Sequence, residues 1–465
     1  MKNLLTAAWF LMAALVCGSA HSQALKPVTL VRGLSHPWGL AFLPGFDSDG
    51  RMLVTERPGR LRILNTRGES GPSITGLPPV DARGQGGLLD VALDPKFSDN
   101  HWVYWSYSEP GPGNTNSTAV ARGKLESNGL RGQLSEVKVI FRQAPKFAST
   151  AHFGSRLVFA RDGRLFITLG DRFLRRDDAQ LLGNHHGKLV RIEADGRVPA
   201  DNPFIGRSGA LPEIWSYGHR NMQGAALHPQ TGELWTHEHG PQGGDELNVE
   251  EAGRNYGWPI ITYGAEYGSG LPIGEGTAKP GVEPPLVYWV PSIAPSGMAF
   301  LTSERYPGWK GDLFIGALRA QMLLRLQLDG RRVVKQERLL QDFNDSMAGS
   351  RAACAPCEGG VEVGHVDHVV AAELLLGLGI GPVEHLGLAV GQAHRRRRRG
   401  GAQAVAGDQN AGLLQGLGVG PVGRHHRALV GLARGLVGGF VRIDHQHVLH
   451  GVSVGWIVAR RHAPS

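Results

Sequence analysis

The sequence predicts an all-β protein built as a β-propeller, and three observations indicate this fold. The chain has 465 residues, of which 67 are Gly and 28 are Pro, as expected for many short strands joined by turns. Only 19% of the residues are charged and 41% are hydrophobic, which excludes a disordered polyelectrolyte. One strand–turn–strand pattern recurs five times, and no ten-residue amphipathic helical run separates the copies.

The first 24 residues have the pattern of an export signal. Lys2 supplies a positive charge, and residues 4–16 form an apolar run that is too short to span a membrane. Small residues follow, as a cleavage site requires. No later segment reaches the roughly 18 consecutive apolar residues of a membrane helix. Residues 25–346 contain no cysteine, so we expect a periplasmic or secreted protein that folds without disulfides.

Each copy of the repeat has a small residue, alternating apolar positions, a turn and a second apolar run. The copies cover residues 39–55, 87–107, 155–168, 224–236 and 297–316. Asp-Gly and Thr-Gly pairs supply tight hairpin turns in three of them. The copies begin 48, 68, 69 and 73 residues apart. Because a four-stranded blade needs about 40–50 residues, each interval accommodates one blade with a loop insertion.

The regular pattern ends near residue 346. The last 119 residues contain no Lys, Thr or Tyr, and they contribute +5 of the net charge of +8. This composition is typical of GC-rich DNA translated out of frame. We therefore expect residues 347–465 to be an out-of-frame tail that has replaced the last blade. For the same reason we do not expect its Cys and His pairs to bind zinc, or its run of five arginines to bind nucleic acid.

Seven longer motifs between about residues 28 and 343 carry a family resemblance. They are Pro37-Trp-Gly-Leu-Ala-Phe, Gly84-Gln-Gly-Gly-Leu-Leu-Asp-Val-Ala, His152-Phe-Gly-Ser-Arg-Leu, Trp215-Ser-Tyr-Gly-His-Arg-Asn-Met-Gln-Gly, Glu238-His-Gly-Pro-Gln-Gly-Gly-Asp-Glu-Leu-Asn, Asn255-Tyr-Gly-Trp-Pro and Pro295-Ser-Gly-Met-Ala-Phe. The chain resembles the soluble quinoprotein sugar dehydrogenases of the bacterial aldose dehydrogenase type. Members are six-bladed propellers that use pyrroloquinoline quinone (PQQ) and calcium. The resemblance implies the same fold and cofactors here, with five blades recognisable in residues 25–346.

His152 is the candidate catalytic base. Oxidation of a sugar hemiacetal requires a group that takes the hydroxyl proton, and an imidazole with a pKa near ~6.5 suits this task at neutral pH. Its position before the third hairpin is also compatible with a purely structural histidine. The resemblance implies that the family's base falls on His152.

The resemblance also implies a set of cofactor-binding residues. PQQ carries three carboxylates, and an arginine side chain can bind a carboxylate through two hydrogen bonds. The implied contacts are Gln85, Arg220, Asn221, Tyr267, Ala317, Leu318 and Arg319. Arg319 stands where a Lys is common in the family, and a guanidinium does not reproduce the geometry of an ammonium group.

Calcium takes six to eight oxygen ligands, which irregular loops present well. The resemblance gives Glu246 the role of a carboxylate ligand and Tyr256 that of a carbonyl ligand. Gly240 and Pro241 resemble further carbonyl donors. Spacing alone provides little support for a metal site, because the chain contains no EF-hand pattern.

These features predict an exported enzyme that oxidises the anomeric hydroxyl of aldoses to lactones and passes electrons to an external acceptor. Three alternatives remain: a non-catalytic propeller that binds a partner, a calcium-dependent lactonase and an inactive frameshifted product. Retention of His152 with Arg220 and Asn221 disfavours the first, and a lactonase would not need the quinone motifs. The family's Arg-x-Arg pair is absent after Phe343, which keeps the third alternative open.

Overall fold

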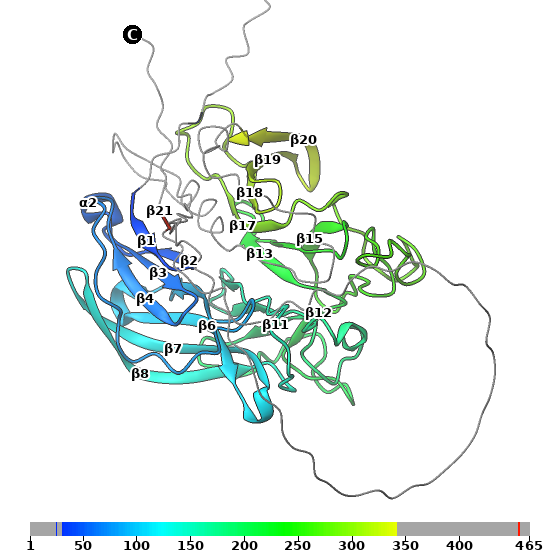
Figure 1. Ribbon diagram of the computed structural model, residues 1–465, viewed down its shortest axis with the longest axis horizontal. Helices are drawn as coiled ribbons and strands as arrows, with labels where there is room; N and C mark the ends of the chain where they lie inside the picture. The colour runs from blue at the N-terminus through cyan, green and yellow to red at the C-terminus, as the bar shows by residue number, and fades with distance from the viewer. Residues whose placement is uncertain (1–24, 26–29, 342–453, 456–465) are drawn as a thin grey trace, which may run out of the picture. The chain divides into compact units, whose positions relative to one another are not determined.

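The computed structural model describes residue 25, residues 30–341 and residues 454–455. The predicted export signal and nearly all of the predicted out-of-frame tail lie outside the described residues. Residues 30–341 form four antiparallel sheets of four strands and one of three (Figure 1). A further pair of short strands, β1 (Arg32–Leu34) and β21 (Val454–Gly455), makes a two-stranded sheet.

The strands follow one another in chain order within each of the five larger sheets. The first sheet contains β2 (Pro37–Phe42), β3 (Met52–Glu56) and β4 (Arg60–Leu64). The second contains β5 (Leu88–Leu93), β6 (Trp102–Pro110), β7 (Asn116–Asn128) and β8 (Arg131–Arg142). The third contains β9 (Leu157–Phe159), β10 (Leu165–Thr168), β11 (Lys188–Ile192) and β12 (Ile214–Tyr217). The fourth contains β13 (Met222–Leu227), β14 (Leu234–Glu238), β15 (Asp245–Glu250) and β16 (Val287–Trp289). The fifth contains β17 (Pro295–Phe300), β18 (Leu313–Ala317), β19 (Met322–Asp329) and β20 (Arg332–Leu339). Short helical turns occur at α2 (Phe46–Asp49), α3 (Phe97–Asn100), η1 (Pro112–Asn114) and η2 (Arg176–Gln180).

The first strand of each sheet is its innermost strand. β2, β5, β9, β13 and β17 contact one another in this order. The sheets therefore follow one another around a common centre as the five blades of a β-propeller arrangement (Figure 1). All five predicted hairpins are confirmed, and each joins the innermost strand of a blade to the next strand outward. The predicted loss of a sixth blade concerns residues that lie outside the described part of the chain.

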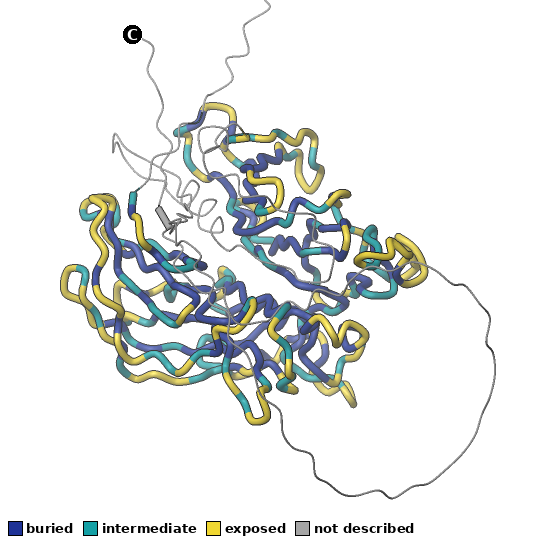
Figure 2. Tube along the Cα trace, in the orientation of Figure 1, coloured by how far each residue is buried: buried dark blue, intermediate teal, exposed yellow. Residues whose placement is uncertain are grey.

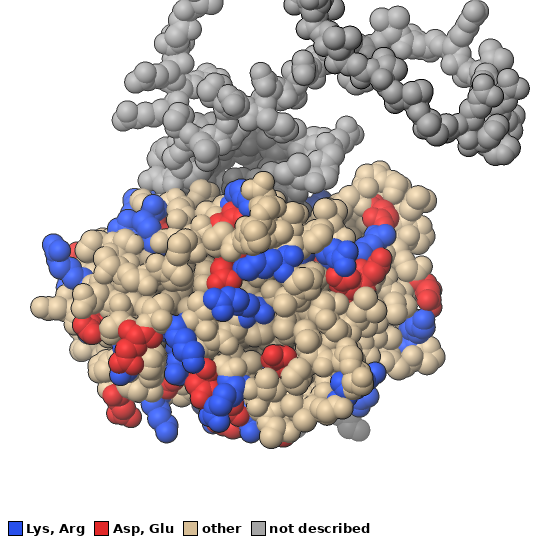
Figure 3. Space-filling view, turned by 90° about the horizontal axis from the view of Figure 1, so that it is seen from below, with Lys and Arg blue, Asp and Glu red and all other residues tan. Residues whose placement is uncertain are grey.

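The outermost strands β8 and β20 are more exposed than the strands next to them, β7 and β19. β5 is buried along most of its length, whereas most positions of β8 and β20 are exposed or partly buried (Figure 2). Period-2 alternation is expected where one face of a strand packs on a neighbouring sheet and the other meets water. The side chains of Lys, Arg, Asp and Glu are interspersed over the face shown in Figure 3. No helix among the described residues is long and apolar enough to cross a membrane.

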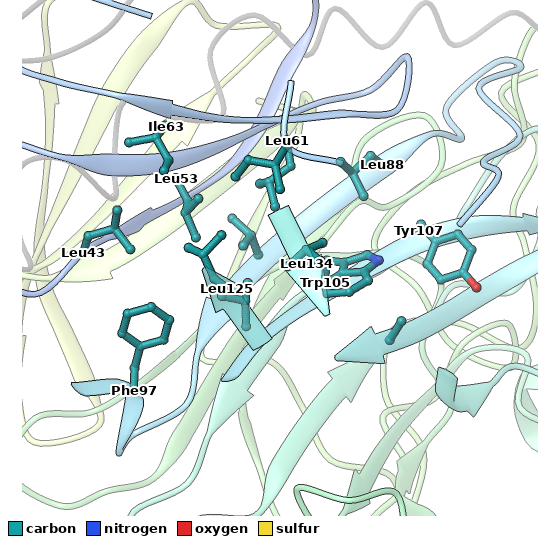
Figure 4. Packing of buried hydrophobic residues seen from close by; sticks show 14 of the residues in the cluster. Leu43, Leu53, Leu61, Ile63, Leu88, Phe97, Trp105, Tyr107, Leu125 and Leu134 are labelled. Carbon is teal, nitrogen blue, oxygen red and sulfur yellow. The ribbon is translucent and has the colours of Figure 1, made fainter. Parts of the chain in front are cut away.

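The first two blades share an apolar core (Figure 4). Leu53, Leu61 and Ile63 of the first blade pack in one cluster with Trp105 and Leu125 of the second, and all five are essentially inaccessible to solvent. Truncation of a buried Trp to Ala typically costs about 3–5 kcal/mol of stability. Apolar contacts therefore join these two blades. The polar residues at the ends of the inner strands remain available for a site.

Candidate active site

The predicted site residues gather at one end of the sheets. In the fourth blade, Glu238 at the end of β14 pairs with Met222 at the start of β13 and with Glu246 near the start of β15. In the fifth blade, Ala317 at the end of β18 pairs with Pro295 at the start of β17. Because the strands are antiparallel, the end of the second strand in a blade lies next to the start of its innermost strand. Residues distant in sequence therefore meet at this one end of the sheets.

His152 forms a buried pair with Asp171. The ring Nδ1 lies 2.6 Å from Asp171 Oδ1, and both side chains are only 1% exposed. Burial alone raises the pKa of the Asp171 carboxyl, but His152 and Arg220 more than offset this, so that its pKa lies below the ordinary value. Asp171 is therefore a carboxylate that accepts a hydrogen bond from Nδ1–H, which leaves Nε2 as the basic nitrogen of the imidazole.

A second donor fixes the Asp171 carboxylate. The indole Nε1 of Trp258 donates to Asp171 Oδ2 over 2.8 Å, across 87 positions of sequence. The guanidinium of Arg220 lies 5.4 Å from the centre of the same indole ring. Trp258 thus connects the His152–Asp171 pair with the part of the site that contains Arg220.

Gln85 and Asn221 hold the backbone around His152. Gln85 Oε1 accepts a hydrogen bond from the backbone N–H of His152 over 2.8 Å. Asn221 Oδ1 accepts one from the N–H of Gly154 over 3.1 Å. The structure therefore places both predicted residues beside the candidate base, where they support a backbone that has a positive φ of 52° at His152 and 63° at Gly154.

Arg220 is buried and faces several polar groups. Its Nη1 donates to the carbonyl oxygen of His239 over 3.0 Å, and its Nη2 to the hydroxyl of Tyr267 over 3.3 Å. Its backbone N–H donates to the carboxylate of Glu238. The Tyr267 side chain is 39% exposed, so this predicted residue lies where the site meets solvent.

Four of the predicted residues line one pocket that is partly open to solvent. These are Arg220, Gly240, Glu246 and Tyr256. Glu238 also lines this pocket. Burial and then the neighbouring Glu238 carboxylate raise the pKa of Glu246 well above its ordinary value. A cation in the pocket would relieve the repulsion between these two carboxylates.

The loop from Gly240 to Gly244 is too tightly wound for larger residues. A Cβ on Gly240 would lie 2.3 Å from the carbonyl oxygen of Gly243 and 2.2 Å from that of Gly244. Asp245 holds this loop, because its Oδ1 accepts a hydrogen bond from the N–H of Gly240 over 3.0 Å. Pro241 is buried in the same loop. Among the described residues no three or more His, Cys, Asp or Glu side chains are grouped to hold a metal, so a cation here would depend on backbone carbonyls as well.

The segment after β18 contributes in a different way. Ala317 is buried at the end of this strand, and Leu318 packs against a cluster of Trp38, Leu89 and Phe153 from three other blades. Arg319 is exposed. The structure therefore places Leu318 under the segment that holds His152, while it provides no contact between Arg319 and the pocket.

Sequence reasoning did not identify four residues that shape the site: Asp171, Trp258, Glu238 and Asp245. Three of them lie within or beside recognised motifs, and Asp171 follows the strand β10 after a glycine. A polar residue at the end of an inner strand is a usable signal for such positions. The pairing of Asp171 with Trp258 carries no such signal, because it arises only when the third and fourth blades meet.

Comparisons with known proteins agree with this architecture. The family model described as "Glucose / Sorbosone dehydrogenase" matches residues 34–347. The aldose sugar dehydrogenase YliI of Escherichia coli is 44% identical over 72% of this chain and 90% of its own length. A crystal structure of the soluble aldose sugar dehydrogenase of E. coli, in the apo form, is 43% identical and superposes with a TM-score of 0.66 over 69% of this chain and 91% of its own. The PQQ-bound aldose sugar dehydrogenase of Streptomyces coelicolor is 29% identical, with a TM-score of 0.55 over 68% of this chain and 85% of its own.

A propeller with a buried His–Asp pair beside a pocket that contains an arginine and two carboxylates fits the class of quinoprotein sugar dehydrogenases. The chain belongs to the glucose/sorbosone dehydrogenase family. The resemblance found in the sequence is thereby confirmed, and the chain is a sugar dehydrogenase by family.

Proposed function

We propose that this chain is an exported oxidoreductase, dependent on PQQ and calcium, that oxidises the anomeric hydroxyl of aldoses to lactones. The observation that carries the proposal is the 2.6 Å contact between His152 Nδ1 and Asp171 Oδ1 beside the Arg220 pocket. The relatives that are aldose sugar dehydrogenases support the substrate class, and the PQQ-bound relative supports the cofactor. The predicted export signal at residues 1–24 supports a periplasmic or secreted location.

The donor groups of the pocket fit both implied cofactors. Glu246, Gly240 and Tyr256 line the pocket, and Pro241 follows Gly240 in the same loop. The Glu246 carboxylate and the backbone carbonyls of Gly240, Pro241 and Tyr256 would supply the oxygen ligands that calcium prefers, and the repulsion between Glu246 and Glu238 favours a cation. The Arg220 guanidinium would bind a carboxylate of PQQ. When bound, PQQ supplies the two-electron acceptor for the hydride that leaves C1 of the sugar.

His152 would move the proton in this reaction. Oxidation of an aldose to its lactone removes a proton from O1 and a hydride from C1, and the C1–O1 bond becomes a carbonyl. Nε2 takes the proton of O1, because Nδ1 is held by Asp171. The Asp171 carboxylate then stabilises the imidazolium that forms, and Trp258 keeps this carboxylate in place. Gln85 and Asn221 fix the backbone that carries the imidazole.

The second candidate, an inactive frameshifted product, has its own supporting observation. The family match ends at residue 347, and the expected Arg-x-Arg pair does not follow Phe343. Resequencing of codons 335 to 360 separates the two candidates. A frame that restores Arg-x-Arg and a sixth hairpin should give an enzyme that reduces a dye when supplied with PQQ, calcium and glucose.

If the printed sequence is confirmed, we expect the purified chain to show no glucose-dependent dye reduction with PQQ and calcium. Robust activity of this unaltered chain would show that the sixth blade is dispensable. Absence of activity from the frame-restored enzyme would contradict the proposed oxidation itself.

A further inference from the structure

The turn that follows Asp171 has an unusual backbone. Arg172 and Phe173 are consecutive residues with positive φ angles of 61° and 64°. Left-handed backbone is unfavourable for residues with a Cβ, and it persists only where the surroundings enforce it. Such strained positions gather at functional sites, where the strained geometry itself places a side chain.

Buried contacts of Arg172 enforce this turn. The Arg172 side chain is inaccessible to solvent, and its Nη2 donates to the carbonyl oxygen of Ser149 over 2.7 Å. Its Nη1 donates to the carbonyl oxygen of His152 over 3.3 Å, and its guanidinium lies 3.7 Å from the centre of the Phe153 ring. The backbone N–H of Phe173 also donates to Asp171 Oδ1 over 2.7 Å. The turn is therefore anchored to the same two residues that form the His–Asp pair.

The result of this anchoring is an exposed aromatic ring beside the candidate base. Asp171 and Arg172 are fully buried, yet Phe173 is 37% exposed and the next residue, Leu174, is 68% exposed. The Phe173 ring meets the His152 imidazole edge-on, with 5.1 Å between ring centres and an interplanar angle of 88°.

A second exposed aromatic residue, Tyr267, lies on a loop that is connected to the loop of Phe173. Arg176 Nη1 contacts Glu266 Oε1 over 2.6 Å, and this ion pair joins the segment that contains Phe173 to the one that contains Tyr267. Tyr267 is 39% exposed, and its hydroxyl contacts Arg220. The two aromatic residues thus belong to connected loops at the solvent side of the site.

We propose that Phe173 is a substrate-contacting residue, whose ring packs against the apolar face of the pyranose ring while His152 faces the anomeric oxygen. A hydroxyl within hydrogen-bonding distance of His152 places its sugar ring within reach of an aromatic ring only 5.1 Å from that imidazole. The strained turn holds the aromatic ring beside the position that the sugar would occupy. The assignment rests on the proposed function for the orientation of the sugar at His152.

The test measures binding of methyl β-D-glucopyranoside, which lacks an anomeric hydroxyl and cannot be oxidised to a lactone. Titration calorimetry is performed on the full chain with PQQ and calcium, for the wild type, Phe173→Ala, Phe173→Gly and Phe173→Tyr. We expect Kd to rise about tenfold in the Ala and Gly variants, since one aromatic contact is worth on the order of 1 kcal/mol, and to stay near the wild-type value in the Tyr variant. Val137→Ala is the matched control, because Val137 is 38% exposed on the outer strand β8 and should leave Kd unchanged.

Thermal melting separates substrate contact from a structural role. Glycine accepts a positive φ without strain, so the Tm of Phe173→Gly should equal or exceed that of Phe173→Ala while its sugar binding stays weak. A Kd within twofold of the wild type in Phe173→Ala, a lower Tm in Phe173→Gly than in Phe173→Ala, or no binding by the wild type would overturn the assignment. Binding that depends on Phe173 without glucose-dependent dye reduction in the frame-restored enzyme would retain the assignment and refute the proposed oxidation.

Discussion

The two sides of the candidate site differ in how their charges are satisfied. On the side of the third blade, Asp171 accepts hydrogen bonds from His152, Trp258 and the backbone of Phe173. On the side of the fourth blade, Glu246 is partly buried, and its pKa is raised by desolvation of its carboxyl and by the neighbouring Glu238 carboxylate. Contacts within the fold thus set the geometry of the base, whereas the pocket carboxylates would be balanced by the cation that we propose to bind there.

The largest effect is expected from removal of the candidate base, His152, on the side of the third blade. In the frame-restored enzyme, His152→Gln should lower kcat by about 10²–10⁴-fold, which is the usual contribution of a general base. His186→Gln is the matched control, because His186 is equally buried and its Nδ1 lies 2.8 Å from Asp178. Its loss should lower stability and leave kcat within a few-fold of the wild type. Equal losses of kcat in both variants, measured by dye reduction, would remove His152 from its catalytic role.

The next largest effect is expected at the pocket on the side of the fourth blade, where Glu246 would bind calcium. Calcium at about 100 times its Kd should stabilise the wild-type chain by about 2.7 kcal/mol, and Glu246→Gln should abolish this gain while raising the Tm of the calcium-free protein. Thermal melting with and without calcium measures both changes. Glu250→Gln is the control, because Glu250 is bonded to Ser216 and Thr236 instead of lining the pocket. A calcium-induced rise in Tm that survives in Glu246→Gln would show that calcium binds elsewhere.

A smaller effect on kcat is expected from a change at Trp258, which connects the two sides of the site. Trp258→Phe removes the N–H donor to the Asp171 carboxylate and should lower kcat of the frame-restored enzyme about tenfold, because one charge-assisted hydrogen bond is lost. Trp235→Phe removes the same ring volume from the core, but the Trp235 Nε1 has no hydrogen-bond partner among the described residues. Its effect should be confined to stability. An unchanged kcat in Trp258→Phe would show that Asp171 needs no second donor.

The smallest effect is the contribution of Asp171 to the pH dependence of stability. The pKa of Asp171 is lowered in the folded protein, so this group contributes stability above the unfolded value of about 3.9 and loses it as the pH falls below that value. Between pH 5 and 3, the urea midpoint of the wild type should therefore fall more steeply than that of Asp171→Asn. Asp162→Asn is the control, because its side chain is 49% exposed at a hairpin tip. Identical slopes in all three proteins would show that Asp171 is not stabilised as a carboxylate.

The hairpins and the pocket differ in how much the sequence reveals. Asp162-Gly163 is a local signal, since a φ angle of 86° at Gly163 is one that a tight turn demands. Asp49-Gly50 marks a connection of another kind, because Gly50, with a φ of 67°, caps the short helix α2. Family motifs likewise placed Arg220 and Glu246, which line one pocket. The contact between Asp171 and Trp258 spans 87 positions and forms only when two blades meet, so no local pattern predicts it. The strained turn at Phe173 escapes prediction for the same reason, because distant buried contacts hold it.

The order of strands within each blade has a practical consequence for protein engineering. Because every blade begins with its innermost strand, Gln85, His152 and Arg220 all lie at the end where the chain enters β5, β9 and β13. The hairpin tips lie at the opposite ends of those strands, and a Cβ on Gly163 at one tip would meet no atom within 4 Å. A spectroscopic label or an affinity tag inserted between Asp162 and Gly163 would therefore report on the protein from the face remote from its chemistry.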